Sequence, residues 1–455
     1  MTASVIILAA GLGTRMASSV VKVLHGVGGL PLVGHVARAV GGLDPERVVV
    51  VVGPGMGSVA DAVRGALSGA AVVAVEQAER KGTGHAVLMA RAALSGWSGP
   101  VLVVYGDTPL IGTETLRRLV EEIGRGRAVA VAGMRPADPG PYGRLVLGED
   151  GALERIVEAK DANEAERAIT LCNAGVLAAD GKVLWDLLDR VTPNNAKGEY
   201  YLTDVIGLAR AAGLSCGAIE ADADEVVGVN SRVELAEVEA LFQTRRRTAA
   251  MLAGATLADP ASVWFSHDTV LGRDVWVGPN VVFGPGVRVG DNVTIKGFCH
   301  LEGTTIAEGA QVGPFARLRP GAAIGADAHI GNFVEVKAAV IEEGAKVNHL
   351  SYVGDAHVGA RANVGAGTIT CNYDGFVKAK TEIGAGAFIG SNTALVAPVK
   401  VGAGAIVAAG SVITRDVGAD ALAVARGEQV EKPGWASRFR ALRAAVKLKS
   451  GKGSG

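Results

Sequence analysis

The sequence predicts a two-part α/β protein, in which an amino-terminal sheet covered by helices precedes a parallel β-helix. Three observations support this prediction. Short aliphatic runs alternate with helix-like segments in the first half. In the second half, an aliphatic residue returns at every sixth position over most of residues 271–413. Glycine supplies 64 of the 455 residues, about twice its average share of ~7%, and the excess lies largely in this repeat.

Five aliphatic runs in the first half predict strands. They are Val5–Ala10, Val48–Val52, Val72–Val75, Val101–Tyr105 and Ala128–Ala132. Helices are expected between them, over Gly57–Leu67, His85–Leu94 and Glu114–Ile123. This alternation indicates a mostly parallel sheet with helices on both faces. Ligands of such sheets bind beyond the carboxyl ends of the strands, so we expect the functional residues to follow the strands directly.

A glycine-rich turn with two basic neighbours follows the first run. It reads LAAGLGTRM over residues 8–16, and Arg15 and Lys22 add positive charge. Glycine amides after a strand can approach a phosphate closely. The turn is neither a P-loop nor a dinucleotide fingerprint, because GxxxxGK[ST] is absent and Met16 replaces the third glycine. A bare GxG also suits an ordinary turn, which is our interpretation of Gly53–Gly57, where no basic residue is near.

Two more polar turns follow strands. Asp107, after the fourth run, is placed to hold Mg²⁺ against a triphosphate, and Asn230 offers a second oxygen ligand. Asp107 alone would equally suit a helix cap. Gln77 and the segment Gly82–His85 form a polar loop suited to a base edge or a sugar.

A connecting helix is expected after residue 230. Ser231 and Glu234 form a capping box. One apolar helix face is marked by Leu235, Val238, Leu241 and Phe242. Arg245–Arg247 follows, and we interpret it as a solvated face. We therefore expect domains over residues 1–230 and 253–455, joined by a linker helix over 231–252.

The six-residue period fits neither a helix nor an ordinary strand and is typical of a β-helix, with small residues at the corners. On the order of nine coils of about 18 residues are expected. The period breaks between Ile369 and Ile383, where Cys371–Gly375 and Lys378 must leave the coil as a loop. His349 directly follows a core position of the coil and can point outward. A loop beside an outward histidine predicts a binding site.

Composition excludes several classes of protein. A net charge of −1 gives no indication of a nucleic-acid partner. Four widely spaced cysteines without a CxxC pair fit a reducing cytosol. The apolar stretch Ala394–Ala409 keeps the six-residue period and contains Pro398 and Lys400, so no membrane insertion is expected. We expect a soluble, cytoplasmic protein with a mobile tail over residues 441–455.

Together, the motifs resemble one family closely, the bacterial bifunctional N-acetylglucosamine-1-phosphate uridyltransferase/glucosamine-1-phosphate acetyltransferase. The similarity extends over nearly the whole chain. It is carried by LAAGLGTRM, KVLH, QAERKGTGHAV, YGDTPL, GEYYLTD and GVNSR, and then by GNFVEVK, NHLSYVGD and GAGTITCNYDG. One departure is Val21, where the family usually has proline. The resemblance implies a Rossmann-like nucleotidyltransferase domain followed by a left-handed parallel β-helix of hexapeptide repeats.

The resemblance also implies two reactions that make UDP-N-acetylglucosamine, a precursor of cell-wall and lipopolysaccharide-type polymers. Acetyl-CoA acetylates glucosamine-1-phosphate, and UTP then donates a uridylyl group. In the uridylyl site, Arg15 and Lys22 would act on phosphates, and Asp107 with Asn230 would hold Mg²⁺. The residues implied to bind UTP and the product are Ala9, Ala10, Gly11, Gly13, Lys22, Gln77, Gly82, Thr83, Tyr105, Gly143, Glu158, Asn173 and Asn230.

In the acetyl site, the resemblance makes His349 the general base, with Glu335 as a candidate orienting partner. An ordinary histidine pKa of about 6.5 suits this task. The residues implied to bind the sugar phosphate are Arg319, Lys337, Tyr352, Asn363 and Lys378. Those implied to face acetyl-CoA are Asn372, Tyr373, Ser391, Ala409 and Arg426. The family is trimeric with this site at subunit contacts, so we expect a homotrimer.

Other functions stay open at this point. The solenoid could serve only for assembly of a single-activity nucleotidyltransferase, although His349 and the neighbouring loop speak against this. It could instead be a zinc hydratase-like solenoid that uses His300, His329, His349 or His357. The Asn/Tyr loop and Lys378 are ill suited as soft-metal ligands. A purely structural rod is the weakest alternative, and the tail is expected to aid solubility rather than contact CoA.

Overall fold

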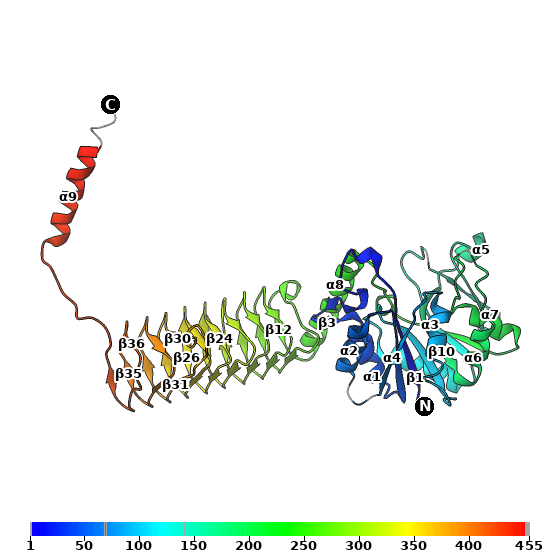
Figure 1. The fold of residues 1–455 in the computed structure, drawn as a ribbon, viewed down its shortest axis with the longest axis horizontal. Helices are drawn as coiled ribbons and strands as arrows, with labels where there is room; N and C mark the ends of the chain where they lie inside the picture. The colour runs from blue at the N-terminus through cyan, green and yellow to red at the C-terminus, as the bar shows by residue number, and fades with distance from the viewer. Residues whose placement is uncertain (1, 68, 70, 141, 196, 451–455) are drawn as a thin grey trace. The chain divides into compact units, whose positions relative to one another are not determined.

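The computed structural model describes residues 2–450 except 68, 70, 141 and 196 (Figure 1). The chain divides into two compact units. The first comprises Met1–Val270 and Val282–Val287, and the second comprises Leu271–Val281 and Arg288–Gly455. The domain boundaries expected from the sequence stay a prediction. No helix in the described ranges has the length and apolar character needed to cross a bilayer.

A mixed sheet with the strand order β11-β7-β10-β6-β1-β4-β5 forms the centre of the first unit. Strand β1 pairs in parallel with β4 and β6, whereas β10 runs antiparallel between β6 and β7. The strands are β1 (Ser4–Ala9), β2 (Gly26–Val27), β3 (Leu30–Pro31), β4 (Arg47–Val52), β5 (Val72–Glu76), β6 (Pro100–Tyr105), β7 (Val129–Met134), β8 (Arg144–Leu147), β9 (Leu153–Val157), β10 (Cys172–Asp180) and β11 (Cys216–Glu220).

All five predicted runs are strands, and their ends differ from the prediction by at most two residues. Strands β8 to β11 were not predicted from the sequence. Strand β10 reads CNAGVLAAD, in which alanine and glycine hide the aliphatic signal of a strand. The helices of this unit are α1 (Leu32–Gly41), α2 (Gly57–Ala66), α3 (Thr83–Met89), α4 (Thr113–Gly124), α5 (Glu164–Arg167), α6 (Gly181–Asp189), α7 (Asp204–Ala211) and α8 (Arg232–Leu252).

Both faces of the sheet are buried under helices, as predicted. Alternate residues of β1 belong to different cores, because successive side chains of a strand point to opposite faces. Val5 and Ile7 pack in a cluster with α1, α2 and α4, while Ile6 packs in a cluster with α3, α6 and α7. The loops after the strands are therefore left to form the ligand-binding edge.

Helix α8 begins with the predicted capping box, in which the Ser231 side chain accepts from the Glu234 amide and Glu234 accepts from the Ser231 amide. The predicted apolar face packs against Met16 and Leu32. The interpretation of Arg245–Arg247 as a solvated face was wrong. Their guanidinium groups donate to the carbonyls of Leu110, Thr269 and Val263, respectively, and so hold three loops.

The second unit is a coil of very short parallel strands, drawn as stacked arrows in Figure 1. One sheet contains β14 (Trp276–Val277), β17 (Thr294–Ile295), β20 (Gln311–Val312), β23 (His329–Asn332), β26 (Lys346–His349), β29 (Asn363–Val364), β32 (Phe388–Ile389), β35 (Ile406–Val407) and β37 (Leu422–Ala423). A second contains β16 (Arg288–Val289), β19 (Thr305–Ile306), β22 (Ala323–Ile324), β25 (Val340–Ile341), β28 (Ala356–Val358), β31 (Thr381–Ile383) and β34 (Val399–Val401). The third contains β18 (His300–Leu301), β21 (Arg317–Leu318), β24 (Glu335–Lys337), β27 (Tyr352–Gly354), β30 (Ile369–Cys371), β33 (Ala394–Val396) and β36 (Val412–Ile413). Other short strands of the repeat are β12 (Thr256–Leu257), β13 (Val270–Leu271) and β15 (Val282–Phe283).

The hexad positions point inward, as predicted. Ile295, Val312, Ile330 and Val347 follow one another in register on successive coils and are buried. The corners hold more than small residues. Phe298, Phe315 and Phe333 occupy corner positions with a positive φ and stack with ring centroids 4.9 and 5.0 Å apart. This ring stacking offsets the cost of the left-handed conformation.

Helix α9 spans Trp435–Ser450 and includes part of the predicted tail. Alanine, leucine, arginine and lysine dominate this segment and are strong helix formers. The mobility expected over residues 441–455 stays a prediction. Residues 451–455 lie outside the described part of the chain.

We predict that Gln243→Leu lowers the free energy of unfolding by about 2–4 kcal/mol. The buried Gln243 side chain donates to the Phe265 carbonyl at 2.7 Å and accepts from the Phe265 amide at 2.8 Å. Leucine would leave both backbone groups buried without a partner. Urea denaturation measures the effect, and Thr244→Ala, at the exposed neighbouring position, is the control. Equal stability of the two variants would contradict this account.

Candidate active sites

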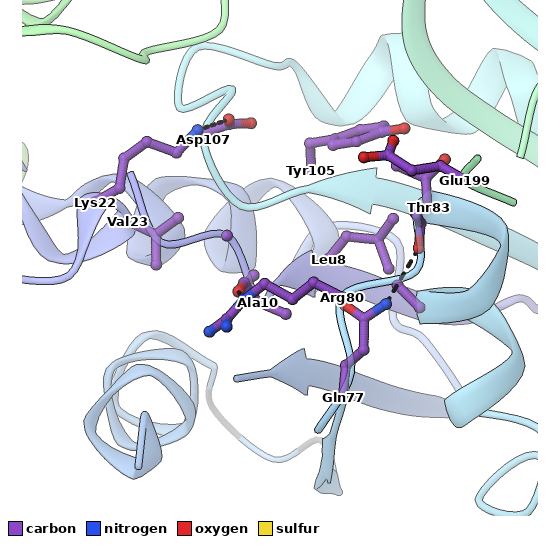
Figure 2. A pocket seen from close by; sticks show the side chains of 14 residues that line it. Leu8, Ala10, Lys22, Val23, Gln77, Arg80, Thr83, Tyr105, Asp107 and Glu199 are labelled. Carbon is purple, nitrogen blue, oxygen red and sulfur yellow. Dashed lines mark hydrogen bonds and ion pairs between the residues drawn. The ribbon is translucent and has the colours of Figure 1, made fainter. Parts of the chain in front are cut away.

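A cavity of about 250 Å³ opens at the carboxyl ends of β1, β5 and β6 (Figure 2). Nine residues expected at the uridylyl site line it, which are Ala9, Ala10, Gly11, Lys22, Gln77, Gly82, Thr83, Tyr105 and Asp107. Strand β1 pairs in parallel with β6 and β4, and β4 pairs in parallel with β5, so the carboxyl ends of all four strands share one edge. The rule that ligands bind beyond this edge therefore located the cavity correctly.

The turn after β1 presents free backbone donors. The amides of Gly11, Leu12 and Gly13 donate to no acceptor among the described residues. Gly13 has φ 64°, and a side chain there would collide with Lys22. Glycine at this position therefore permits both the left-handed turn and the close approach of Lys22. Free amides beside an ammonium group form an anion-binding surface.

The two predicted metal ligands both accept from one cation. Lys22 Nζ donates to Asp107 Oδ2 (Figure 2). It also donates to Asn230 Oδ1 at 3.0 Å. The side chains of Lys22 and Asp107 are 12% and 18% exposed, so this ion pair is largely shielded from water. A carboxylate oxygen and an amide oxygen that converge on a positive charge are suitable ligands for Mg²⁺.

Residues expected to hold the sugar phosphate gather beside this cavity. The Asn173 amide donates to the Gly143 carbonyl at 2.7 Å, and Glu158 lies next to Gly143. Burial raises the pKa of Glu158. Burial, with a smaller contribution from the Asp107 carboxylate, raises the pKa of Tyr105 to about 12, so its hydroxyl stays a neutral donor.

Not every predicted residue reaches the cavity. Arg15 is exposed and has no partner among the residues that the structure describes. Arg80 and Glu199, in contrast, line the cavity but were not predicted. Both belong to motifs that carried the resemblance, QAERKGTGHAV and GEYYLTD, and membership of these motifs was the available signal.

In the second unit, His349 lies at the edge of a cavity of about 200 Å³. His349 Nδ1 is 2.6 Å from Asn332 Oδ1, and the two residues are paired in register on adjacent coils. With Asn332 as acceptor, Nδ1 carries the proton and Nε2 is left as a base. Within one chain, the Glu335 carboxylate accepts from Arg319 at 2.8 Å, and its expected role as orienting partner of His349 stays a prediction.

Three of the cations expected at the sugar phosphate lie together on neighbouring coils. The Lys378 ammonium beside Lys337 lowers the pKa of Lys337, and Arg319 acts on it in the same direction. Like charges held this close destabilise one another unless an anion lies between them. Tyr352 adjoins the group, and its hydroxyl is 3.4 Å from Asn372 Nδ2.

Residues expected at acetyl-CoA follow one corner of the solenoid. The Gly367 amide donates to the His349 carbonyl at 3.2 Å, and the Gly410 amide donates to the Ser391 carbonyl at 2.8 Å. One coil further, Arg426 Nη1 donates to the Ala409 carbonyl at 2.8 Å.

The remaining predicted residues of this site are less tightly placed. Asn363 is paired in register with Lys346, and Tyr373 is 60% exposed in the loop. None of the predicted sugar-phosphate residues lines the cavity of His349. His349 ends β26, whereas Lys337 and Tyr352 belong to β24 and β27 of a different sheet, so one chain presents the base and these residues on different faces of the coil.

The chain is similar to known proteins in both halves, and two relatives cover nearly its full length. The chain matches the MobA-like NTP transferase domain over residues 5–175 and the bacterial transferase hexapeptide over 268–303, 303–338 and 380–415. It is 62% identical over 448 residues to the Bifunctional protein GlmU of Paramagnetospirillum magneticum, covering 98% of both chains. It is also 62% identical over 438 residues to that of Rhodospirillum rubrum, covering 96% of this chain and 97% of the relative. A solved UDP-glucose pyrophosphorylase complexed with UDP-glucose is 19% identical and covers 54% of this chain and 100% of its own, with a TM-score of 0.45.

We predict that acetyl transfer depends on Asn332. Asn332→Leu removes the Nδ1 partner and should lower kcat about 10- to 100-fold. Asn332→Asp keeps an acceptor at the same position, so it should lower kcat less than Asn332→Leu does. Thiol release at saturating substrate tests this, and a native kcat in Asn332→Leu would refute the contact.

Proposed function

The chain belongs to the family of bifunctional GlmU proteins, and from this membership we propose how its two sites make UDP-N-acetylglucosamine. It transfers an acetyl group from acetyl-CoA to the amine of glucosamine-1-phosphate. It then transfers a uridylyl group from UTP to N-acetylglucosamine-1-phosphate and releases pyrophosphate. The product is a precursor of cell-wall and lipopolysaccharide-type polymers.

The observation that supports the uridylyl site most strongly is the contact of the Lys22 ammonium with both Asp107 and Asn230. In our proposal, these two oxygens hold Mg²⁺ when UTP is bound, and Lys22 and Arg15 then act on the phosphates. Bound Mg²⁺ supplies positive charge that stabilises the triphosphate and the leaving pyrophosphate.

The sugar phosphate is itself the nucleophile in this step. Its oxygen forms a bond to the α-phosphorus of UTP as the bond to pyrophosphate breaks. Because the phosphate is already anionic, alignment and charge neutralisation are enough, and no general base is required. Gly143, Glu158 and Asn173 would hold the sugar, and the cavity residues Gln77 and Thr83 would contact the uridine.

For acetyl transfer, we propose that His349 Nε2 removes a proton from the amine as its nitrogen attacks the thioester. The new C–N bond forms, the C–S bond breaks, and CoA leaves as the thiol. Arg319, Lys337 and Lys378 would hold the phosphate of the sugar. The remaining contacts are assigned to Tyr352 and Asn363 for the sugar phosphate, and to Asn372, Tyr373, Ser391, Ala409 and Arg426 for acetyl-CoA.

A homotrimer fits this second site best. His349 and Lys337 lie on different faces of the coil in one chain, so a neighbouring copy can bring the base and the cation group together across an interface. The hexapeptide repeat offers the long parallel side that such packing needs. The proposal also retains the domains over residues 1–230 and 253–455 with the linker helix over 231–252, and a cytoplasmic location.

The two activities should fail independently. His349→Ala should lower acetyl transfer by about 100-fold or more and leave uridylyl transfer within about twofold, because only the first reaction needs a base. Asp107→Ala should give the opposite result by loss of the metal ligand. Free thiol and pyrophosphate are measured separately on the same preparation. His357→Ala, which removes an exposed histidine paired with Glu342, is the control. Loss of both activities in either folded variant would contradict the assignment of two separate sites.

A further inference from the structure

Arg80 lies in the loop between β5 and α3 and reaches across to the turn after β1. Its Nε donates to the Ala10 carbonyl at 2.8 Å (Figure 2). Its neighbour Lys81 is paired with Glu79, whereas Arg80 has no carboxylate partner in the part of the chain that the structure describes. The guanidinium group of Arg80 is thus bound to a backbone oxygen at the nucleotide cavity and not to an acidic side chain.

The adjacent turn leaves room for this guanidinium group. A Cβ atom at Gly53 would lie 2.6 Å from Arg80 Nη2 and 3.1 Å from Met56 Sδ. Gly53 follows β4, which pairs with both β1 and β5. Because Gly53 has no side chain, the turn Gly53–Gly57 leaves space for the Arg80 guanidinium group. The sequence indicated this segment only as a turn.

The contact to Ala10 has a consequence for the next amide. In a trans peptide, the carbonyl of one residue and the N–H of the next point in opposite directions. Holding the Ala10 carbonyl therefore fixes the direction of the Gly11 N–H. Gly11 lines the cavity, and its amide has no acceptor among the described residues.

We propose that Arg80 is a positioning residue, which holds the Ala10 carbonyl and so orients the Gly11 amide toward the phosphates of bound UTP. The same contact joins the loop that carries Gln77 and Gly82 to the turn after β1. The inference rests on the proposed uridylyl transfer and adds to it a residue that acts through the backbone.

Two substitutions in the full-length protein separate this role from a direct charge effect. Glutamine Nε2 is the same number of bonds from the backbone as arginine Nε, so Arg80→Gln keeps the donor and loses the charge. Arg80→Met keeps the length and loses both. Arg80→Met should raise the KM for UTP about tenfold, as expected for loss of one charge-assisted hydrogen bond, with kcat within about twofold. Arg80→Gln should stay within about twofold of the native KM.

The Gly53 side of the contact gives a second, coupled test. Gly53→Ala should displace the guanidinium group and raise the KM for UTP as Arg80→Met does. Combined with Arg80→Gln, which removes the Nη atoms, Gly53→Ala should recover most of the native KM. Strict additivity of the two changes would overturn the inference, because residues in contact are expected to couple.

Steady-state kinetics of pyrophosphate release provide these values, and a kcat of pyrophosphate release close to the native value checks that the first unit of each variant is folded. Arg64→Met, which removes an exposed arginine paired with Asp61 on α2, is the control. A KM raised equally in Arg80→Gln and Arg80→Met would overturn the inference and indicate a direct effect of charge. A native KM in Arg80→Met would also overturn the inference, because it would show that the contact to Ala10 does not affect UTP binding. Absence of pyrophosphate release from the native protein would instead remove the proposed function itself.

Discussion

Parallel strand pairing is the constraint on which both units depend. In the first unit it brings the carboxyl ends of β1, β5 and β6 to one edge, where turns from distant parts of the sequence meet around Lys22. In the second unit it places each residue directly beside its counterpart one coil away, as with Asn332 and His349. Because parallel strands need crossover connections, neighbours in space are far apart in the sequence.

Positive charge marks both candidate sites, paired with a carboxylate at the first and lying beside another positive charge at the second. Lys22 donates to a carboxylate and an amide oxygen, whereas Lys337 has a second lysine beside it. The proximity of Lys337 and Lys378 is unfavourable in the protein alone and becomes favourable when a phosphate lies between the two ammonium groups. The free amides after β1 act in the same sense, since an anion satisfies donors that the fold leaves open.

The sequence predicted those features that depend on local pattern. Aliphatic runs located the five strands, the hexads located the inward face of the coil, and Ser231 with Glu234 located the start of α8. Contacts that depend on register were not predicted. Within one chain, coils containing a five-residue step place the counterpart of His349 17 residues back, at Asn332, which was not predicted. Arg80 and Arg245–Arg247 were missed because their partners are backbone carbonyls, which no side-chain pattern identifies.

The loop that carries Asn372 and Tyr373 shows where such a coil can change during evolution. Strand β30 before it is paired in register with β33, and β31 after it is paired in register with β34. One residue inserted within a strand would exchange inward and outward side chains until the register was restored. Residues added between these strands leave every later rung in place. The length of this loop can therefore change without any change in the register of the coil. Such a change alters the residues that face the acceptor or the acyl donor and leaves the fold intact.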